Sequence, residues 1–252
     1  MLGGLAFWRT KAADGGNERH TRSHLLSDFI LGSQDGIVNV LAVLLGVAAG
    51  AMQQYGSASV VFRIVLAGGL AATFGESISM GAVAYTSTLA RRDHYLGELA
   101  REEQEMRESP EVERQEVSEV FRRWGFEGTE LEAAVGHIIS RPKAWLEFMM
   151  AHELGLAPLE ENQARRSALL VGFAAIFGSL IPLIPFIVFP GDIVLGMMGA
   201  VIVAAIVLFI IGWYKGRITI GRPYRSGFQM LAIGIVSAIA GFLIAYMVGA
   251  PP

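Results

Sequence analysis

The chain contains no cysteine, so neither a disulfide bond nor a thiolate metal ligand is available to it. Charge is also scarce: 17% of the 252 residues are charged, whereas 53% are hydrophobic, and the mean hydropathy is +0.47. A soluble domain of this length can bury a core with much less apolar sequence. The excess of apolar residues therefore predicts an integral membrane protein.

The signatures of several large protein classes are missing as well. The sequence shows no ATP-binding loop, no nucleophile paired with a histidine, and no basic face of the kind that binds nucleic acid. We therefore predict a protein that is not an enzyme, uses no organic cofactor and binds no nucleic acid. Strand-like alternation of apolar and polar residues is also absent, which favours a purely helical fold.

Five apolar stretches are long enough to cross a bilayer, whose hydrocarbon core takes about 20 residues of helix. They lie near residues 28–49, 60–89, 168–189, 193–214 and 228–248. The chain then divides into a tail (1–26), two membrane helices (27–89), a polar insert (90–165) and three membrane helices (166–252). The predicted fold class is an all-α integral membrane protein with five transmembrane helices and a helical domain inserted between the second and third.

Lysine and arginine are distributed unevenly over the links between these spans. They gather in the N-terminal tail, at both ends of the insert and between spans four and five, at Arg9, Lys11, Arg19, Arg22, Arg91, Arg92, Arg165, Arg166, Lys215, Arg217, Arg222 and Arg225. The links near 53–59 and 189–192 and the segment 248–252 carry none. Because basic links stay in the cytoplasm, we expect a cytoplasmic N-terminus and insert, and a C-terminus outside the cell or in a lumen.

Capping signals set the helix boundaries within the insert. The second span continues without a break as far as Ser109-Pro110, which favours a serine N-cap followed by proline at the first helical position. Residues 129–132 have capping-box spacing and predict a third helix. Pro142 opens a fourth helix, which is expected to run to about Leu154.

The insert is unusual for its carboxylates, because nine glutamates lie between Glu98 and Glu119. Helical winding places Glu113 on the apolar face of its helix and Glu153 on the same side as Met149. A carboxylate on a packing face must be neutral, paired or bound to metal, since burying it bare costs several kcal/mol. The pattern predicts a cation site. A solvated pair of acidic helices with i,i+4 salt bridges is the alternative.

The residue types near this cluster bear on which ion it prefers. Carboxylate oxygens alone suit Mg²⁺, Ca²⁺ or Mn²⁺, whereas the sulfurs of Met149 and Met150 would favour a transition ion such as Fe²⁺. Methionine on a helix face more often fills a core. His94 and His152 are also available, although an isolated histidine near a helix junction is more often structural, and their role stays open.

Two acids lie inside the predicted membrane spans, with no basic residue at comparable depth. Asp35 is about two turns into the first span, and Glu76 is near the middle of the second, one turn from Met80. Residues of these types on neighbouring helices would make a small ion site with two titratable groups. Polar contact between helices is the alternative, and it accounts well for Ser77 and Asn39.

Several of these motifs resemble the vacuolar iron transporter family. The resemblance rests on Gln-Asp-Gly at 34–36, Ile-Ser-Met-Gly at 78–81, the charged segment 91–95 and the last span from 225 onward. The pattern of the insert, Glu102-x-x-Glu105 and Glu113-x-x-Glu116 followed by Met149-Met150 and Glu153, is similar to the cytoplasmic metal-binding domain of the plant-type members. Many prokaryotic relatives lack that domain, so the combination is specific.

The resemblance implies a homodimeric, five-span Fe²⁺/H⁺ antiporter that exports iron from the cytoplasm. Asp35 and Met80 would line the translocation path at the dimer interface, with Glu76 as a companion. The implied metal ligands of the insert are Glu102, Glu105, Glu113, Glu116, Met149, Met150 and Glu153. The membrane would be the plasma membrane in a prokaryote and the vacuolar membrane in a plant or fungus.

Two other functions stay open at this point. One is a membrane-anchored protein that binds and sequesters iron, and the other is a channel for divalent cations. The sequence also leaves open the preferred ion among Fe²⁺, Mn²⁺, Co²⁺, Zn²⁺ and Ni²⁺, and the proton stoichiometry. Asp35 and Glu76 favour a transporter over an anchor, because a pure anchor has no use for acids inside the membrane.

Overall fold

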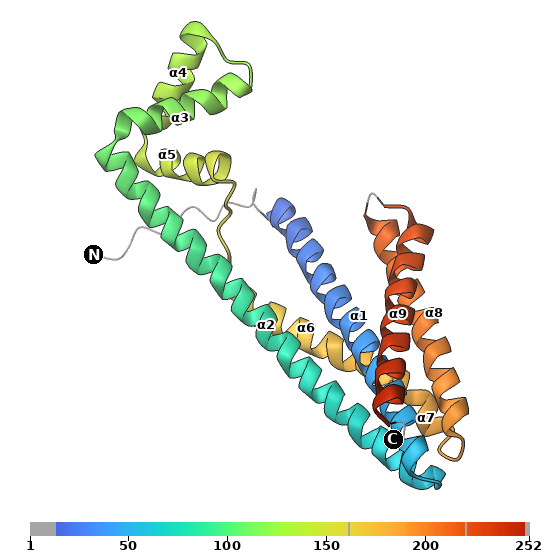
Figure 1. Cartoon of the computed structure of the whole chain (residues 1–252). Coiled ribbons are helices and arrows are strands. Elements are labelled where there is room, and N and C mark those ends of the chain that lie inside the picture. The colour runs from blue at the N-terminus through green and yellow to red at the C-terminus, as the bar shows by residue number, and fades with distance from the viewer. Residues whose placement is uncertain (1–13, 161, 220, 250–252) are drawn as a thin grey trace. The chain divides into compact units, whose positions relative to one another are not determined.

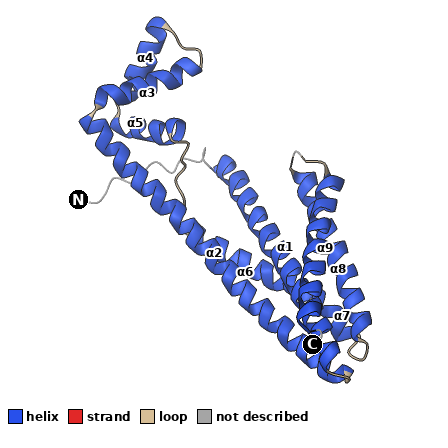
Figure 2. Ribbon diagram, viewed as in Figure 1, coloured by secondary structure: helices blue, strands red, loops and turns tan. Residues whose placement is uncertain are grey.

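The computed structural model describes residues 14–160, 162–219 and 221–249, and every regular element in these ranges is a helix (Figure 2). The described chain forms two compact units (Figure 1). The first, here called the membrane unit, takes the chain up to Tyr85 and again from Arg165; the second, the inserted unit, is Thr86–Ala164. The purely helical fold class is confirmed.

The long helices carry most of the chain. They are α1 (Asp14–Gln54), α2 (Ala58–Glu108), α6 (Gln163–Leu180), α8 (Ile193–Ile218) and α9 (Pro223–Gly249). The short ones are α3 (Pro110–Arg123), α4 (Gly128–Ile139), α5 (Pro142–Phe148), the π-helix η1 (Met149–Glu153), the 3₁₀-helix η2 (Ile181–Leu183) and α7 (Ile184–Val188). Helix α2 is continuous, as predicted, and contributes residues to both units.

Five helical segments are long and apolar enough to cross a membrane, which confirms the five predicted spans. They are Leu25–Gln54, Ala58–Glu108, Gln163–Val188, Ile193–Ile218 and Pro223–Val248. Each contains the corresponding predicted stretch almost completely. At a rise of about 1.5 Å per residue, even the 26-residue segments exceed the hydrocarbon thickness of roughly 30 Å.

The core of the membrane unit forms along α1. Ile37 and Leu44 are completely buried in a cluster that also holds Leu183 and Phe186, from the η2–α7 segment, and Leu208 of α8. Ile37 and Leu44 are seven residues apart and therefore lie on one face of the helix. Among the described long helices α1 has the most buried membrane segment, so it is the element around which the others pack.

Glycines let α1 and α6 approach each other at backbone distance. A Cβ added to Gly32 would lie 2.4 Å from the carbonyl oxygen of Val171, and one added to Gly36 would lie 2.4 Å from that of Ala175. Such spacing has no room for any side chain. Small residues at the contact are the usual means by which helices pack in lipid, where burial of apolar area supplies little driving force between helices.

The third span is not one regular helix. It consists of α6, the 3₁₀ turn η2 and α7, with Pro182 and Pro185 inside the interruption. Proline has no N–H to donate to the preceding turn, and its ring clashes with the carbonyl four residues earlier. The span itself is confirmed, and its break follows from these two prolines.

The inserted unit has an apolar core of its own, formed by α3, α4, α5 and η1. Its buried members are Val117, Val120, Phe121, Leu131, Val135, Trp145, Phe148 and Met149. The rings of Phe121 and Phe148 stack with centroids 5.2 Å apart and planes at 14°. This core fixes the faces of α3 and η1, and with them the directions of the acidic side chains described below.

The predicted start of α3 is confirmed: Ser109 is its N-cap and Pro110 occupies the first turn, although the serine side chain makes no capping hydrogen bond. Two other local predictions about the insert were wrong in detail. Helix α4 begins at Gly128 after Glu127, so Thr129 lies inside the helix and no capping box forms; Gly128, with φ of 57°, supplies the turn. The fourth helix changes from α to π at Met149 and does not continue as one α-helix to Leu154.

Candidate metal centre and intramembrane acid pair

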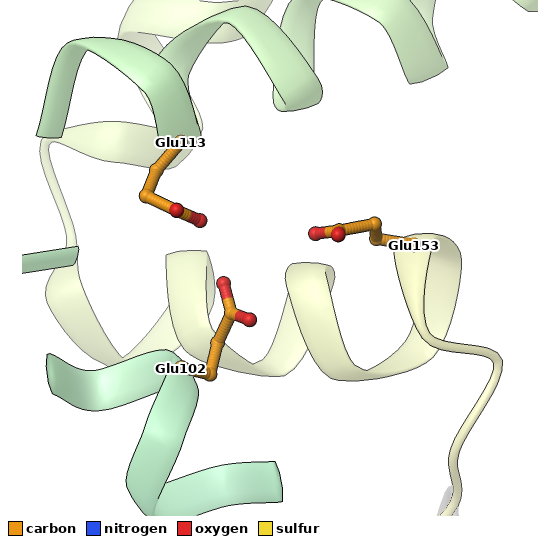
Figure 3. A group of neighbouring side chains, drawn as sticks. All are labelled: Glu102, Glu113 and Glu153. Atoms are coloured by element: carbon orange, nitrogen blue, oxygen red, sulfur yellow. The ribbon is translucent and has the colours of Figure 1, made fainter. Parts of the chain in front are cut away.

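Three carboxylates of the inserted unit meet at one point. Glu102 comes from α2, Glu113 from the first turn of α3, and Glu153 from the end of η1 (Figure 3). One oxygen from each lies within 4.8 Å of the other two. Glu102 and Glu113 are only 1% and 4% exposed, whereas Glu153 is open to solvent. The three carboxylates therefore form a cluster in which Glu102 and Glu113 are buried and Glu153 can be reached from solvent.

The fold supplies each of these side chains by a different device. Glu113 lies one helical turn before Val117, which is completely buried, so the face of α3 that packs inward carries the acid with it. Glu153 ends a π-helix whose extra residue per turn changes the direction of the side chains that follow. Met149 and Met150 precede it in the same turn and are buried.

Two oxygens of this group are left without a partner. Among the described residues, Glu102 Oε1 and Glu113 Oε2 are buried and accept no hydrogen bond. The arginines that could neutralise them lie elsewhere: Arg101 is 2.7 Å from Glu98, and Arg114 is 2.7 Å from Glu132. Native proteins rarely leave buried carboxylate oxygens unpaired, and a proton, a cation or a water molecule can fill this role.

The electrostatics of the cluster favour protons when no cation is bound. Burial raises the pKa of Glu102 to about 8, helped by the negative charge of Glu113 and by the hydrogen bond that the two carboxyls share once one of them is protonated. Burial, together with the charges of Glu116 and Glu113, raises the pKa of Glu153 to about 7. Burial and the charge of Glu113 also raise the pKa of Glu116. Glu102 and Glu153 therefore hold protons near neutral pH, and a bound cation would have to displace them.

The structure separates the seven predicted ligands of the insert into groups. It brings Glu102, Glu113 and Glu153 together and places Glu116 in contact with Glu153. Glu105 is about half-exposed, and its carboxylate is 3.8 Å from Arg101. Met149 is a completely buried member of the apolar core.

The spacing of the three oxygens suits a divalent ion. Hard divalent cations bind oxygens at about 2.0–2.6 Å, so two ligands of one ion are separated by at most about 5 Å. The three oxygens all lie within 4.8 Å of one another, which is inside that limit. The two histidines lie to the side: His152 packs against the rings of Trp124 and Phe148, and His94 is 3.9 Å from Glu98.

A second group of polar side chains lies inside the membrane unit. Asn39 Nδ2 on α1 donates a hydrogen bond to Glu76 Oε1 on α2, at 3.0 Å. The side chain of Asp35, one turn before Asn39, also interacts with Glu76. All three are half-buried, and so is Met80, one turn beyond Glu76 on α2. The two predicted intramembrane acids are therefore neighbours, on facing helices.

Asn39 makes a polar contact between two helices, as the sequence favoured, and its partner is one of the two intramembrane acids. Its amide is the donor that holds Glu76 beside Asp35. The signal was present in the sequence, because Asn39 follows Asp35 by four residues and shares its helix face. The hydroxyl of Ser77, by contrast, donates to the carbonyl oxygen of Thr73 at 2.6 Å and is buried, as expected of a packing residue.

Comparison with known proteins identifies the family of this chain. The VIT family profile matches residues 26–246, which include both the intramembrane acids and the carboxylate cluster of the insert. The chain belongs to the VIT family. Membership confirms the resemblance that the sequence motifs indicated.

Among its VIT-family relatives is Vacuolar iron transporter 1 of Arabidopsis thaliana, which is 35% identical over 236 residues, or 92% of this chain and 91% of the relative. Vacuolar iron transporter 1 of Oryza sativa is 33% identical over 245 residues, covering 95% and 94% of the two chains. Protein CCC1 of Saccharomyces cerevisiae is more distant, at 24% identity over 89% of this chain and 69% of the yeast protein. Family and relatives support a multi-pass membrane protein that transports metal ions, iron in particular.

Proposed function

We propose that this protein is a homodimeric antiporter that exports Fe²⁺ from the cytoplasm in exchange for protons. The observation that carries the proposal is the acid pair of Asp35 and Glu76 on facing membrane helices, with Asn39 bonded to one of its members. The membrane segments Leu25–Gln54 and 64–89 contain no lysine or arginine that could neutralise the pair. Intramembrane acids of this kind usually lie on ion or proton pathways.

Competition for the same oxygens is the physical basis of exchange. A carboxylate must lose its proton before it can bind a metal ion. Fe²⁺ arriving from the cytoplasm displaces protons from the pair, and protons arriving from the other side displace Fe²⁺. Met80, one turn from Glu76, would add a soft sulfur that favours transition ions over Mg²⁺. Asp35, Glu76 and Met80 are the proposed transport residues.

The inserted unit would collect the ion before transport. Its proposed ligands are centred on Glu102, Glu113 and Glu153, with Glu116 alongside, and the solvent-exposed Glu153 provides the entrance. Glu105, Met149 and Met150 complete the set that the family resemblance implies. Because this site binds ions but belongs to the inserted unit, whereas the proposed transport residues belong to the membrane unit, its loss should slow transport without abolishing it.

Orientation and assembly belong to the same proposal. The basic residues of the links support a cytoplasmic N-terminus and inserted unit, with the C-terminus outside or in a lumen. The membrane segment of α2 is largely uncovered within one chain, and exposed side chains such as Phe74 and Ile78 are available for a second copy. The membrane would be a vacuolar membrane in a plant or fungus and a plasma membrane in a prokaryote.

Replacement of Asp35 by asparagine tests the proposal. The protein is reconstituted in liposomes with an acidic interior, and Fe²⁺ uptake is followed together with a proton-sensitive dye. Asp35→Asn should reduce proton-coupled uptake by at least about tenfold, because the amide cannot exchange a proton for the ion. Asp28→Asn is the control. It makes the same change near the start of the same span, at a side chain that accepts a hydrogen bond from Ser167, and this variant should transport normally. Full coupled uptake by Asp35→Asn would remove that residue from the mechanism.

A further inference from the structure

The end of the α8–α9 hairpin carries a concentrated positive charge. Four exposed basic side chains lie within eleven residues of sequence, namely Lys215, Arg217, Arg222 and Arg225. From residue 193 to 252 the sequence contains no aspartate or glutamate at all. The two last membrane helices therefore share one strongly basic end.

Close packing of the two helices brings these charges together. A Cβ added to Gly216 would lie 2.7 Å from the Cα of Pro223, and one added to Gly212 would lie 2.6 Å from the carbonyl oxygen of Ser226. The end of α8 and the start of α9 are thus in backbone contact. The basic residues on either side of the turn are consequently gathered at one end of the hairpin.

Within the described chain, no carboxylate forms an ion pair with any of the four. Arg217 contacts an aromatic ring, because its guanidinium carbon lies 5.2 Å from the centre of the Trp213 ring. Arg222 and Arg225 also stand at the beginning of α9, where the helix dipole is positive and disfavours cations. The first turn of α9 has no acid to offset them. The positive electrostatic potential at this end of the hairpin is therefore high, and no nearby carboxylate of the described chain neutralises it.

The surroundings of the cluster indicate the kind of anion that it meets. Tyr214 and Tyr224 flank the basic residues and are 50% and 68% exposed. Aromatic side chains of this amphipathic type are enriched at the level of the lipid headgroups. Helices α8 and α9 are apolar membrane spans that end at this point, so the cluster lies where phospholipid phosphates are found.

We propose that the basic end of the α8–α9 hairpin is a binding site for the phosphate of anionic phospholipids. Tyrosine and tryptophan hold the hairpin end at the headgroup layer, and the arginines bind the phosphate through paired N–H donors. A soluble phosphate would gain the same charges but none of the apolar contact that keeps a lipid beside these helices. Such a lipid would stabilise the hairpin, whichever side of the membrane it faces.

A pair of matched double variants tests this site. The protein in neutral detergent micelles is titrated with phosphatidylglycerol, phosphatidylcholine or inorganic phosphate, and its melting temperature is recorded. Phosphatidylglycerol should raise the melting temperature, and the other two should not. Because one basic residue near an anionic surface contributes about a fivefold gain in affinity, Arg222→Gln/Arg225→Gln should weaken the apparent affinity for phosphatidylglycerol roughly 30-fold.

The control changes net charge equally at exposed arginines of the inserted unit. Arg122→Gln/Arg123→Gln should keep the response to phosphatidylglycerol, and Arg222→Lys/Arg225→Lys should keep most of it. If Arg222→Gln/Arg225→Gln does not fold, Lys215→Gln/Arg217→Gln provides the same test from the α8 side. An equal response in the hairpin and control variants would overturn the proposal, and so would stabilisation by inorganic phosphate as strong as that by the lipid.

Discussion

Acidification should weaken metal binding at the inserted unit steeply, because its carboxyls titrate near neutral pH. The pKa of Glu102 is about 8 and that of Glu153 about 7 when no ion is bound. If both must lose their protons before the ion binds, about one site in five is ready at pH 7.5 and about one in a thousand at pH 6. Affinity should therefore rise with pH, and fall on the order of 100-fold between pH 7.5 and pH 6.

Calorimetry of the full-length protein in detergent, with Fe²⁺ under anaerobic conditions, measures this dependence. Repeating the titration in buffers of different ionisation enthalpy counts the protons released, which should be about one per ion at pH 7.5 and about two at pH 6. Glu113→Gln should abolish the heat of Fe²⁺ binding, which assigns that heat to this site. Glu119→Gln changes an exposed acid of the same helix and should leave Fe²⁺ binding intact. An affinity that is the same at both pH values, or binding without proton release, would refute this reasoning.

Two further predictions concern packing and topology. Gly36→Ala should destabilise the membrane unit by roughly 1–3 kcal/mol, because its Cβ would lie 2.4 Å from the carbonyl oxygen of Ala175. Gly97→Ala, where no atom lies within 4 Å, should be neutral or stabilising by up to about 1 kcal/mol; melting temperatures of the two variants in one detergent decide it. Single cysteines introduced at Asp192 and at Glu119, an exposed position of the inserted unit, should react with an impermeant maleimide from opposite sides of sealed vesicles. Reaction of both from the same side would contradict the predicted topology.

The membrane spans could be predicted from sequence because hydropathy alone determines them. The interruption of the third span was not predicted, although Pro182 and Pro185 cannot continue a regular helix and were a signal for it. The sequence suggested that Asp35 and Glu76 could share one ion site, but it could not show that the two side chains are in contact. That contact depends on how far α1 and α2 are shifted along each other, and that register is set by contacts between helices, not by the local sequence.

The carboxylate cluster shows a similar division. Helical winding correctly placed Glu113 on the buried face of α3. Helical winding could not show which glutamate of α2 joins the cluster, because Glu98, Glu102 and Glu105 lie on one side of the helix. In the structure Arg101 pairs with Glu98 and Glu105, whereas Glu102 is buried. The π-helix before Glu153 was also missed, since an α-helical period assigns side-chain directions only within regular helix.

Uphill movement of iron is the most direct test of proton-coupled antiport. Liposomes containing the protein start with equal Fe²⁺ on both sides, and the interior is then made acidic. The account predicts that Fe²⁺ accumulates inside above the external concentration while protons leave, and that a protonophore abolishes the accumulation. A protein that only lets the two concentrations equalise is a channel, and one that binds Fe²⁺ without flux is a sequestering protein; either result would contradict the account.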